Sequence, residues 1–166
     1  GGRVRWRKLG PVDLSQRRPA WMATHASVPF VEPADRHLLK IWFSGRDAKQ
    51  RSHIGWCLVA LREPNRAREL APAPALAPGE LGGFDDSGAM LSWIAQKGGR
   101  RLYYYIGWNL GVTVPFRNAI GLAVEEGGTV KRAFPGPILD RTAREPHFVA
   151  SCCVLPEEGR WRMWYL

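Results

Sequence analysis

The chain has 166 residues, of which 45% are hydrophobic and 23% are charged, and its formal net charge at pH 7 is +9. This composition excludes wholesale disorder, which combines low hydrophobicity with high charge, and is typical of one globular domain. No apolar run reaches the roughly 18 residues of a membrane-spanning helix, and no apolar stretch follows Arg3 and Arg5, so we expect neither a transmembrane segment nor a signal peptide.

Short strands are the predominant predicted element. Gly and Pro recur every few residues and disfavour helices, and the best helical candidate, 62–70, contains Pro64. Runs rich in aromatic and β-branched residues, bounded by turn residues, are typical of strands. In chain order these runs span residues 27–31, 39–43, 54–59, 89–94, 102–106, 120–124, 149–155 and 161–166. Turn sequences at 97–100 and 157–160 predict hairpins, and the fold class is predicted to be all-β and antiparallel.

The predicted strands recur as a group. Aligning Phe43 with Tyr105 and Tyr165 gives separations of 62 and 60 residues, and the strand at Ile54 recurs at Ile120, 66 residues later. Such periods predict stacked supersecondary units, and four-stranded units of this kind are β-propeller blades. The alternative is a β-sandwich in which the aromatic strands recur by coincidence.

The repeat predicts a single partial propeller domain over 1–166. We expect blade 1 at about 22–76, blade 2 at about 84–140 and half of blade 3 at about 145–166, which makes about 2.5 blades of a five-bladed ring. The last residues fall inside a predicted strand. We therefore expect either a truncated chain or a homodimer in which a second copy covers the exposed strand edges and completes the ring.

Charge and cysteine usage restrict the partners. Six basic residues fall in the first twenty positions, and the remaining bases are spread out without the stripe of a nucleic-acid face, so nucleic acid is not the expected partner. Cys57, Cys152 and Cys153 suggest neither a disulfide framework nor a zinc site, and free thiols indicate a reducing, cytoplasmic location. Neither histidine spacing nor a Gly-rich phosphate loop indicates a metal or a cofactor.

Three local motifs carry a family resemblance: FDDSGAM at 84–90, YYIGWN at 104–109 and VPFRNAIGL at 114–122. With the blade pattern, they resemble the five-bladed propeller glycosidases of the arabinanase, invertase and levansucrase clan. They look more closely like an uncharacterised propeller family whose members are found near bacterial surface-polysaccharide biosynthesis genes. The likeness runs from about Val4 to Leu166, the N-terminal half of a typical member, and it implies a carbohydrate ligand in a central pocket.

Candidate catalytic residues follow from the resemblance. Glycoside hydrolysis uses two carboxylates that flank the scissile bond, and the clan holds them at the inner strands of different blades. The matching positions are His25, Asp86 and Glu145. His25 stands where the clan has an Asp; an imidazole can act as a general base, but that is not the clan's chemistry. The structural alternative for His25 is a hydrogen-bonded histidine of the pocket or the core. For Asp86 it is an aspartate that closes a turn, and for Glu145 it is an ion pair with Arg144 or Arg141.

Polar residues at the expected pocket rim form the candidate substrate-binding set. Trp108 is expected to stack on a sugar ring, and Arg46 to bind a carboxylate or phosphate through two N–H groups. The full set is Arg46, Asp47, Asp85, Trp108, Asn109, Arg117, Asn118 and His147. The alternative is that tryptophans pack between blades and Arg–Asp pairs hold loops. The tryptophans expected in the core or between blades are Trp42, Trp56, Trp93, Trp161 and Trp164.

Three functions remain open. The leading hypothesis is a carbohydrate-active, glycosidase-like propeller that acts on bacterial polysaccharide or its precursors, with a phosphorylase reaction as a variant. The second is a non-catalytic glycan-binding or scaffolding propeller, which His25 in place of an Asp favours. The third is a basic domain that binds nucleic acid or another anionic polymer.

Overall fold

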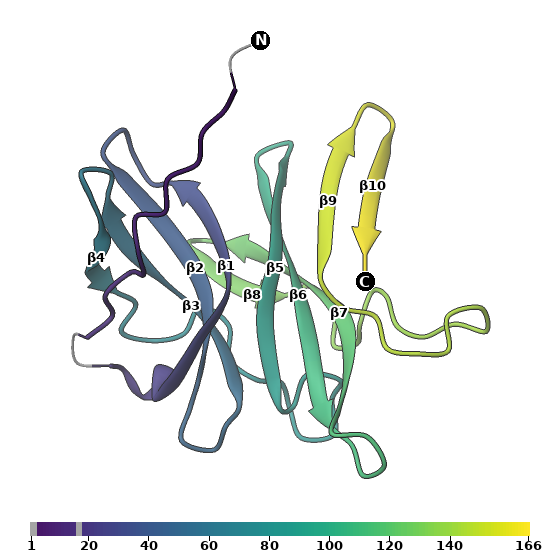
Figure 1. Cartoon of the computed structure of the whole chain (residues 1–166). Coiled ribbons are helices and arrows are strands. Elements are labelled where there is room, and N and C mark those ends of the chain that lie inside the picture. The colour runs from purple at the N-terminus through teal and green to yellow at the C-terminus, as the bar shows by residue number, and fades with distance from the viewer. Residues whose placement is uncertain (1–2, 16–17) are drawn as a thin grey trace.

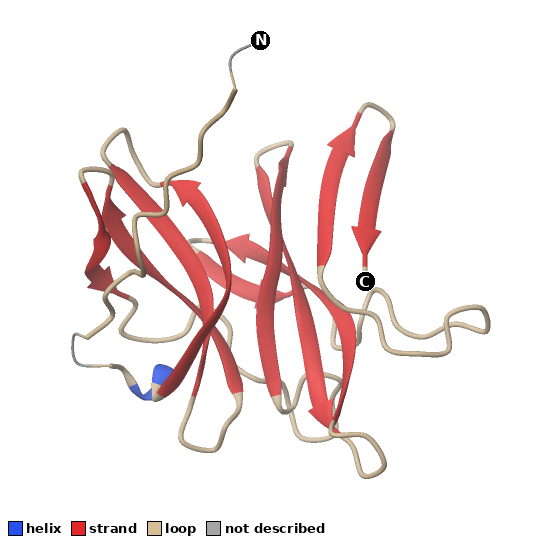
Figure 2. Cartoon of the chain, viewed as in Figure 1, coloured by secondary structure: helices blue, strands red, loops and turns tan. Residues whose placement is uncertain are grey.

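The structure, a computed structural model, describes residues 3–15 and 18–166. Within these residues it contains ten strands and one short 3-10 helix, Ala20–Met22, so the all-β prediction is confirmed (Figure 2). No helix in this described part has the length and apolarity to cross a bilayer. The basic N-terminal segment, Arg3 to Lys8, is exposed; Arg17, predicted to belong to the same basic patch, lies outside the described residues.

The strands form two similar four-stranded units and a hairpin (Figure 1). The first unit is an antiparallel meander of β1 (Thr24–Pro33), β2 (Leu38–Arg46), β3 (Ser52–Ala60) and β4 (Glu63–Leu70). The second unit repeats the meander with β5 (Gly88–Lys97), β6 (Arg100–Leu110), β7 (Phe116–Glu126) and β8 (Thr129–Arg132). The third group is a hairpin of β9 (Cys152–Glu157) and β10 (Arg160–Tyr165), which we call the third hairpin.

The connections that leave the two units also match. After β4, the Ile54 N–H donates to the Leu76 carbonyl at 2.9 Å, and the Ala75 N–H donates to the Ile54 carbonyl at 2.8 Å. After β8, Ile120 makes the same pair of bonds with Leu139 and Ile138, at 2.9 and 2.8 Å. Ile54 and Ile120 are the residues that the sequence alignment pairs, so the repeat extends to the backbone hydrogen bonds of the loops.

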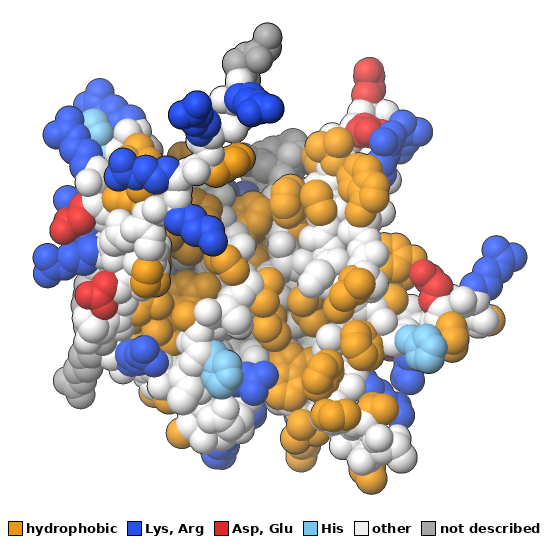
Figure 3. All heavy atoms as spheres, viewed as in Figure 1, with side chains coloured by type: hydrophobic (Ala, Val, Ile, Leu, Met, Phe, Trp, Pro, Cys, Tyr) orange, Lys and Arg blue, Asp and Glu red, His pale blue; other side chains and the backbone are white. Residues whose placement is uncertain are grey.

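The first strands of the three groups, β1, β5 and β9, run in the same direction and lie side by side, each beginning at its lower end in Figure 1. One parallel bridge, Ser52 with Gly88, joins the first unit to the second. Across the described residues the sheets do not close on themselves. Apolar side chains are spread over the face on which β1, β5 and β9 lie (Figure 3).

Three apolar clusters hold the groups together. Trp42, Leu91 and Tyr103 are among the residues packed between the two units, and Tyr104 and Val154 are among those packed between the second unit and the third hairpin. The remaining cluster packs the other face of the first unit against the segment before β1, through Trp21, Met22 and Phe43. The central strands, β2, β3, β5, β6 and β7, therefore bury much of their length, which explains the dense apolar runs in the sequence.

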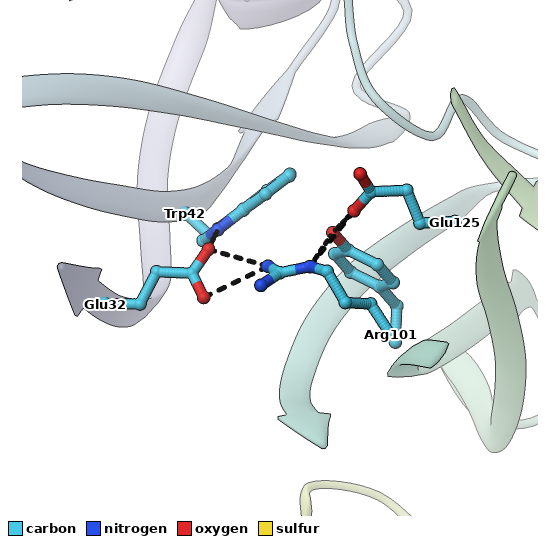
Figure 4. A network of polar contacts seen from close by, with 5 residues as sticks. Glu32, Trp42, Arg101 and Glu125 are labelled. Carbon is cyan, nitrogen blue, oxygen red and sulfur yellow. Dashed lines mark hydrogen bonds and ion pairs between the residues drawn. The ribbon is translucent and has the colours of Figure 1, made fainter. Parts of the chain in front are cut away.

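A polar cluster joins the two units at the ends opposite the Ser52–Gly88 bridge (Figure 4). Arg101 donates to both carboxylate oxygens of Glu32, at 2.8 and 3.0 Å, and lies 3.0 Å from Glu125. The Trp42 indole N–H also donates to Glu32, and the Tyr103 hydroxyl donates to Glu125. We call these five residues the Arg101 cluster. Burial lowers the pKa of Arg101, but its bonds to Glu32 and Tyr103 outweigh this effect and leave the pKa above its usual range.

One sequence expectation was wrong, and the weak helical candidate of an otherwise strand-rich sequence is a strand. Residues 63–70 form β4, in agreement with the all-β prediction, because they pair with β3 and bury Ala67, while Pro64 stands near the strand's start. Trp161 and Trp164 lie on β10 with 43% and 51% of their surface exposed, so in this chain they are not core residues. Cys57 and Cys152 are buried free thiols, as expected, and burial raises the pKa of each to about 11.

Candidate functional site

A cavity of about 480 Å³ opens at the end of the molecule where β5 begins. Its walls are the β2–β3 loop, the segment that precedes β5 and the β6–β7 loop. Three predicted site residues, Arg46, Asp86 and Trp108, line it, so we call it the Asp86 cavity. The three residues come from different elements, and Arg46 and Trp108 are 62 positions apart in the sequence.

Arg46 and Trp108 form a stacked pair on one wall. The guanidinium carbon of Arg46, the last residue of β2, lies 5.4 Å from the centre of the Trp108 ring. The indole is 9% exposed, and its N–H has no hydrogen-bond partner among the described residues. Gly88 leaves room for the ring, because a Cβ there would lie 2.2 Å from the Trp108 Nε1. The backbone beneath the indole therefore fixes its position, and its small exposed part lines the cavity.

Asp86 lines the cavity and also stabilises the turn before β5. Its Oδ2 accepts a hydrogen bond from the Gly82 N–H at 3.0 Å, and its Oδ1 accepts one from the Ser87 hydroxyl at 2.9 Å. The Ser87 oxygen in turn accepts the Leu110 N–H. Within the described residues Asp86 forms no ion pair. Its carboxylate is thus fixed in place, and its charge is not neutralised by a protein cation.

Asp85, predicted to bind substrate, is buried instead. Its carboxylate is 2.7 Å from an Arg132 nitrogen and accepts the Tyr105 hydroxyl at 3.1 Å, while only 2% of the residue is exposed. Burial and the Asp85 carboxylate raise the pKa of Tyr105. Arg132 also donates to the Ala77 carbonyl. Asp85 therefore ties β8 to the connection between the units and is not accessible to a ligand in the Asp86 cavity.

Asp47 shapes the cavity from behind the β2–β3 loop. Its Oδ1 accepts the N–H groups of Lys49 and Arg51, each at 2.9 Å, and its Oδ2 contacts the Arg51 and His53 side chains at 2.9 to 3.0 Å. Burial raises the pKa of Asp47, but hydrogen bonds from His53 and Arg51 outweigh it and lower the pKa to about 2. The Arg51–Asp47 pair therefore holds the loop. Arg–Asp pairs that hold loops were the structural alternative to substrate binding in the sequence analysis.

The other two candidate catalytic residues do not line the Asp86 cavity. His25 is exposed at the start of β1, with Nδ1 2.9 Å from the Thr24 hydroxyl. Glu145 is exposed, and its carboxylate accepts the Tyr165 hydroxyl at 2.9 and 3.0 Å rather than pairing with an arginine in the described chain. His147, predicted to bind substrate, is exposed on the same loop.

The backbone at the start of β1 is strained. His25 and Val28 have φ angles of 61° and 52°, values that are costly for side chains other than Gly, and the β1–β2 register shifts twice over Thr24 to Phe30. Ser151, just before β9, has a φ of 30°. Such strain often marks functional positions. It occurs at the start of β1, where His25 itself is strained, and just before β9, and these are two of the three strands that begin the groups.

The remaining predicted residues line a separate, smaller cavity of about 220 Å³. Asn109, Arg117 and Asn118 meet Asp140 and Arg141 there. Successive residues of a strand point to opposite faces, so Trp108 and Asn109 serve different cavities. No group of three or more potential metal ligands occurs in the described residues.

Sequence reasoning missed part of the wall of the Asp86 cavity. Lys49, Gln50 and Arg51 line it alongside Arg46. The available signal was the polar run of residues 46–51 directly after an aromatic strand. Only its first two residues, Arg46 and Asp47, were chosen as candidates. The apolar wall, which includes Leu110, Pro115 and Phe116, was also missed, since single apolar residues in a loop carry no pattern.

The chain has relatives of greater length. No protein-family model matches it. Over 161 residues it is 38% identical to the uncharacterized proteins MT1551 and Rv1502, from two strains of Mycobacterium tuberculosis. Each match covers 96% of this chain and 54% of the relative, so the chain spans about half the length of the curated relatives it matches.

Proposed function

We propose that the chain is part of a five-bladed β-propeller that binds carbohydrate, to which it contributes two blades and half of a third. Three features support the propeller: the repeated four-stranded meander, the matching connections at Ile54 and Ile120, and the adjacent first strands that run in one direction. Propeller blades are meanders of this size arranged around a shared axis. The resemblance to the arabinanase, invertase and levansucrase clan suggests the same architecture.

The Asp86 cavity is the proposed carbohydrate site. The observation that carries this proposal is the stacked Arg46–Trp108 pair beside a fixed carboxylate. Sugar rings have apolar C–H faces that pack on aromatic rings and hydroxyl groups that bond to charged side chains. Small-molecule sites typically combine an apolar wall with a few fixed polar groups, and this cavity has both.

The proposed reaction is glycosidase-like chemistry on bacterial polysaccharide or its precursors. Asp86 would serve as one of the two carboxylates, as acid or base. Glu145 is the second candidate, at the start of the third group.

A non-catalytic glycan-binding role is the second candidate function. It is favoured by one observation: among the described residues that line the cavity, Asp86 is the only carboxylate. His25, in place of the clan's Asp, lies exposed and bonded to Thr24. A cavity with one carboxylate can bind a sugar but lacks the pair that the hydrolytic mechanism uses.

Hydrolysis assays with surface-polysaccharide fragments test the enzymatic form of the proposal. Asp86→Asn should lower turnover by at least about a hundredfold while calorimetry still detects binding, and Glu145→Gln should act similarly. Glu158→Gln, on the exposed β9–β10 turn, is the matched control. Unchanged turnover in both Asp86→Asn and Glu145→Gln would exclude these catalytic roles. Binding without any product would establish the non-catalytic form instead.

A further inference from the structure

We infer that the Asp86 cavity selects an acidic saccharide, one whose sugar ring carries a carboxylate or phosphate group. This inference rests on the proposed carbohydrate function and specifies its ligand class. It comes from the balance of charge in the cavity wall, the unused donors of Arg46 and the apolar surface beside them.

The cavity wall has more cations than the protein neutralises. Arg46, Lys49 and Arg51 line it, against the single carboxylate of Asp86. Arg51 is paired with Asp47 at 2.9 Å, whereas Arg46 and Lys49 form no ion pair within residues 3–15 and 18–166. Asp86 contributes one negative charge, held by hydrogen bonds from Gly82 and Ser87, against the two unpaired cations, so the wall keeps a net positive charge. A negatively charged group in the cavity is therefore favoured.

Arg46 is well suited to hold that group. Its guanidinium is stacked on Trp108, which restricts its side-chain freedom before a ligand arrives. No protein group in the described chain accepts a hydrogen bond from its side chain. A guanidinium presents five N–H donors in a planar fork that matches a carboxylate or phosphate. The stacked arrangement thus leaves the donors available for a charged oxygen pair.

The neighbouring wall fits a ring rather than a bare anion. Trp108, Pro115 and Phe116 line the same cavity, and Phe116 is 43% exposed. A free phosphate would leave this apolar surface in water, and a neutral sugar would leave the Arg46 donors and the Lys49 charge without a partner. An acidic sugar satisfies both, since its ring packs on the aromatic side chains while its anionic group meets Arg46.

Matched pairs of sugars test the inference on the chain itself. We would titrate the chain, by NMR, with glucuronate against glucose, galacturonate against galactose, mannuronate against mannose and glucose 1-phosphate against glucose, and with inorganic phosphate alone. One charge-assisted contact of about 1.4 kcal/mol corresponds to a tenfold ratio of dissociation constants. At least one acidic sugar should bind roughly tenfold more tightly than its neutral partner.

Variants then assign the preference to Arg46. Arg46→Gln should abolish the acidic preference, and Arg46→Lys should retain only part of it, because the fork and the stacking are lost. Arg100→Gln removes the same charge from the far end of β6, roughly 27 Å along the strand from Trp108, and should leave the preference intact.

The outcomes separate this inference from the proposed function. Equal binding of acidic and neutral sugars would overturn the inference and leave carbohydrate binding standing. A preference that survives in Arg46→Gln would also overturn it. Binding of no sugar in the set would contradict both, and binding of inorganic phosphate as tightly as the acidic sugars would show an anion site without a role for the ring.

Discussion

Two adjacent aspartates have different roles at the start of β5. Asp85 is buried against Arg132 and Tyr105, while Asp86 lines the cavity. The alternation of an extended chain predicts that neighbours point to opposite faces, so only one of the pair was expected to face the pocket, and Asp86 was favoured as the catalytic candidate while Asp85 stayed in the substrate-binding set. The partner of Asp85 could not be predicted, because Arg132 lies 47 residues away and meets it only through the fold.

The pH dependence of stability should depend in part on Asp47. Because its pKa is about 2 in the folded chain and 3.8 is its ordinary value, its ionised form stabilises the fold above about pH 4. This contribution, roughly 2 kcal/mol, is lost as the pH falls toward 2. Urea unfolding at pH 7, 4, 3 and 2 should show Asp47→Asn less stable than the parent at pH 7, with the difference shrinking on acidification.

Glu158→Gln is the control for this measurement, since Glu158 is exposed on a turn. The difference between this variant and the parent should be small at each pH. A constant difference between Asp47→Asn and the parent from pH 7 to pH 2 would contradict the assigned role of the Asp47 carboxylate.

Among the elements, strands that bury apolar faces were predictable and strands that depend on pairing were not. The eight predicted runs fall largely within β1, β2, β3, β5, β6, β7, β9 and β10. The two missed strands, β4 and β8, are polar and lie at the outer side of their units, so their sequences lack an apolar run. Local propensity gave no reason to choose a strand there, since their register comes from β3 and β7.

The Arg101 cluster should contribute to stability by joining the two units. Arg101→Met removes the only cation within the cluster and leaves Glu32 and Glu125 as neighbouring partly buried carboxylates. We expect a loss of about 2 kcal/mol in the free energy of unfolding, a value reduced from that of fully buried pairs because Arg101 is 27% exposed. Urea denaturation measures this loss.

Arg100→Met is the matched control, because Arg100 is exposed at the first position of β6, next to Arg101 in the sequence. Its effect should stay within about 0.5 kcal/mol. If the two variants lost the same free energy of unfolding, the joining role of the cluster would be rejected.

At the scale of the whole molecule, the sequence predicted the repeat of strands but only part of the candidate site. Separations near 60 residues predicted the two units and the hairpin, since apolar strands recur with the fold. The Asp86 cavity contains one of the three predicted catalytic residues, and His25 and Glu145 lie outside it. Strand order places these residues at the same end of their sheets, but side-chain direction at a loop or a bulge depends on backbone angles that the sequence does not reveal.

Self-association is the prediction at this scale. The outer edge of β10 has no partner strand in the described chain, and the hairpin leaves Trp161, Trp164 and Leu155 between 43% and 51% exposed. Unpaired edges with apolar side chains favour strand addition. We propose that a second copy covers this edge, and analytical ultracentrifugation of the chain should detect a dimer that Trp164→Lys weakens.

A folded monomer at all accessible concentrations would refute this prediction, with circular dichroism used to establish folding. If Trp164→Lys left the dimer unchanged, the interface would lie elsewhere than on β10. Lys131→Gln, at an exposed position on β8, is the control and should leave the association unchanged.

The two attachments between the four-stranded units have a consequence for ligand entry. The Ser52–Gly88 bridge fixes the units at the cavity, and the Arg101 cluster fixes them at the opposite end. Hinge motion about either attachment is therefore opposed by the other. The walls that the two units provide therefore keep their spacing in the absence of a ligand, and binding of the proposed sugar would need no slow opening step and would cost little backbone entropy.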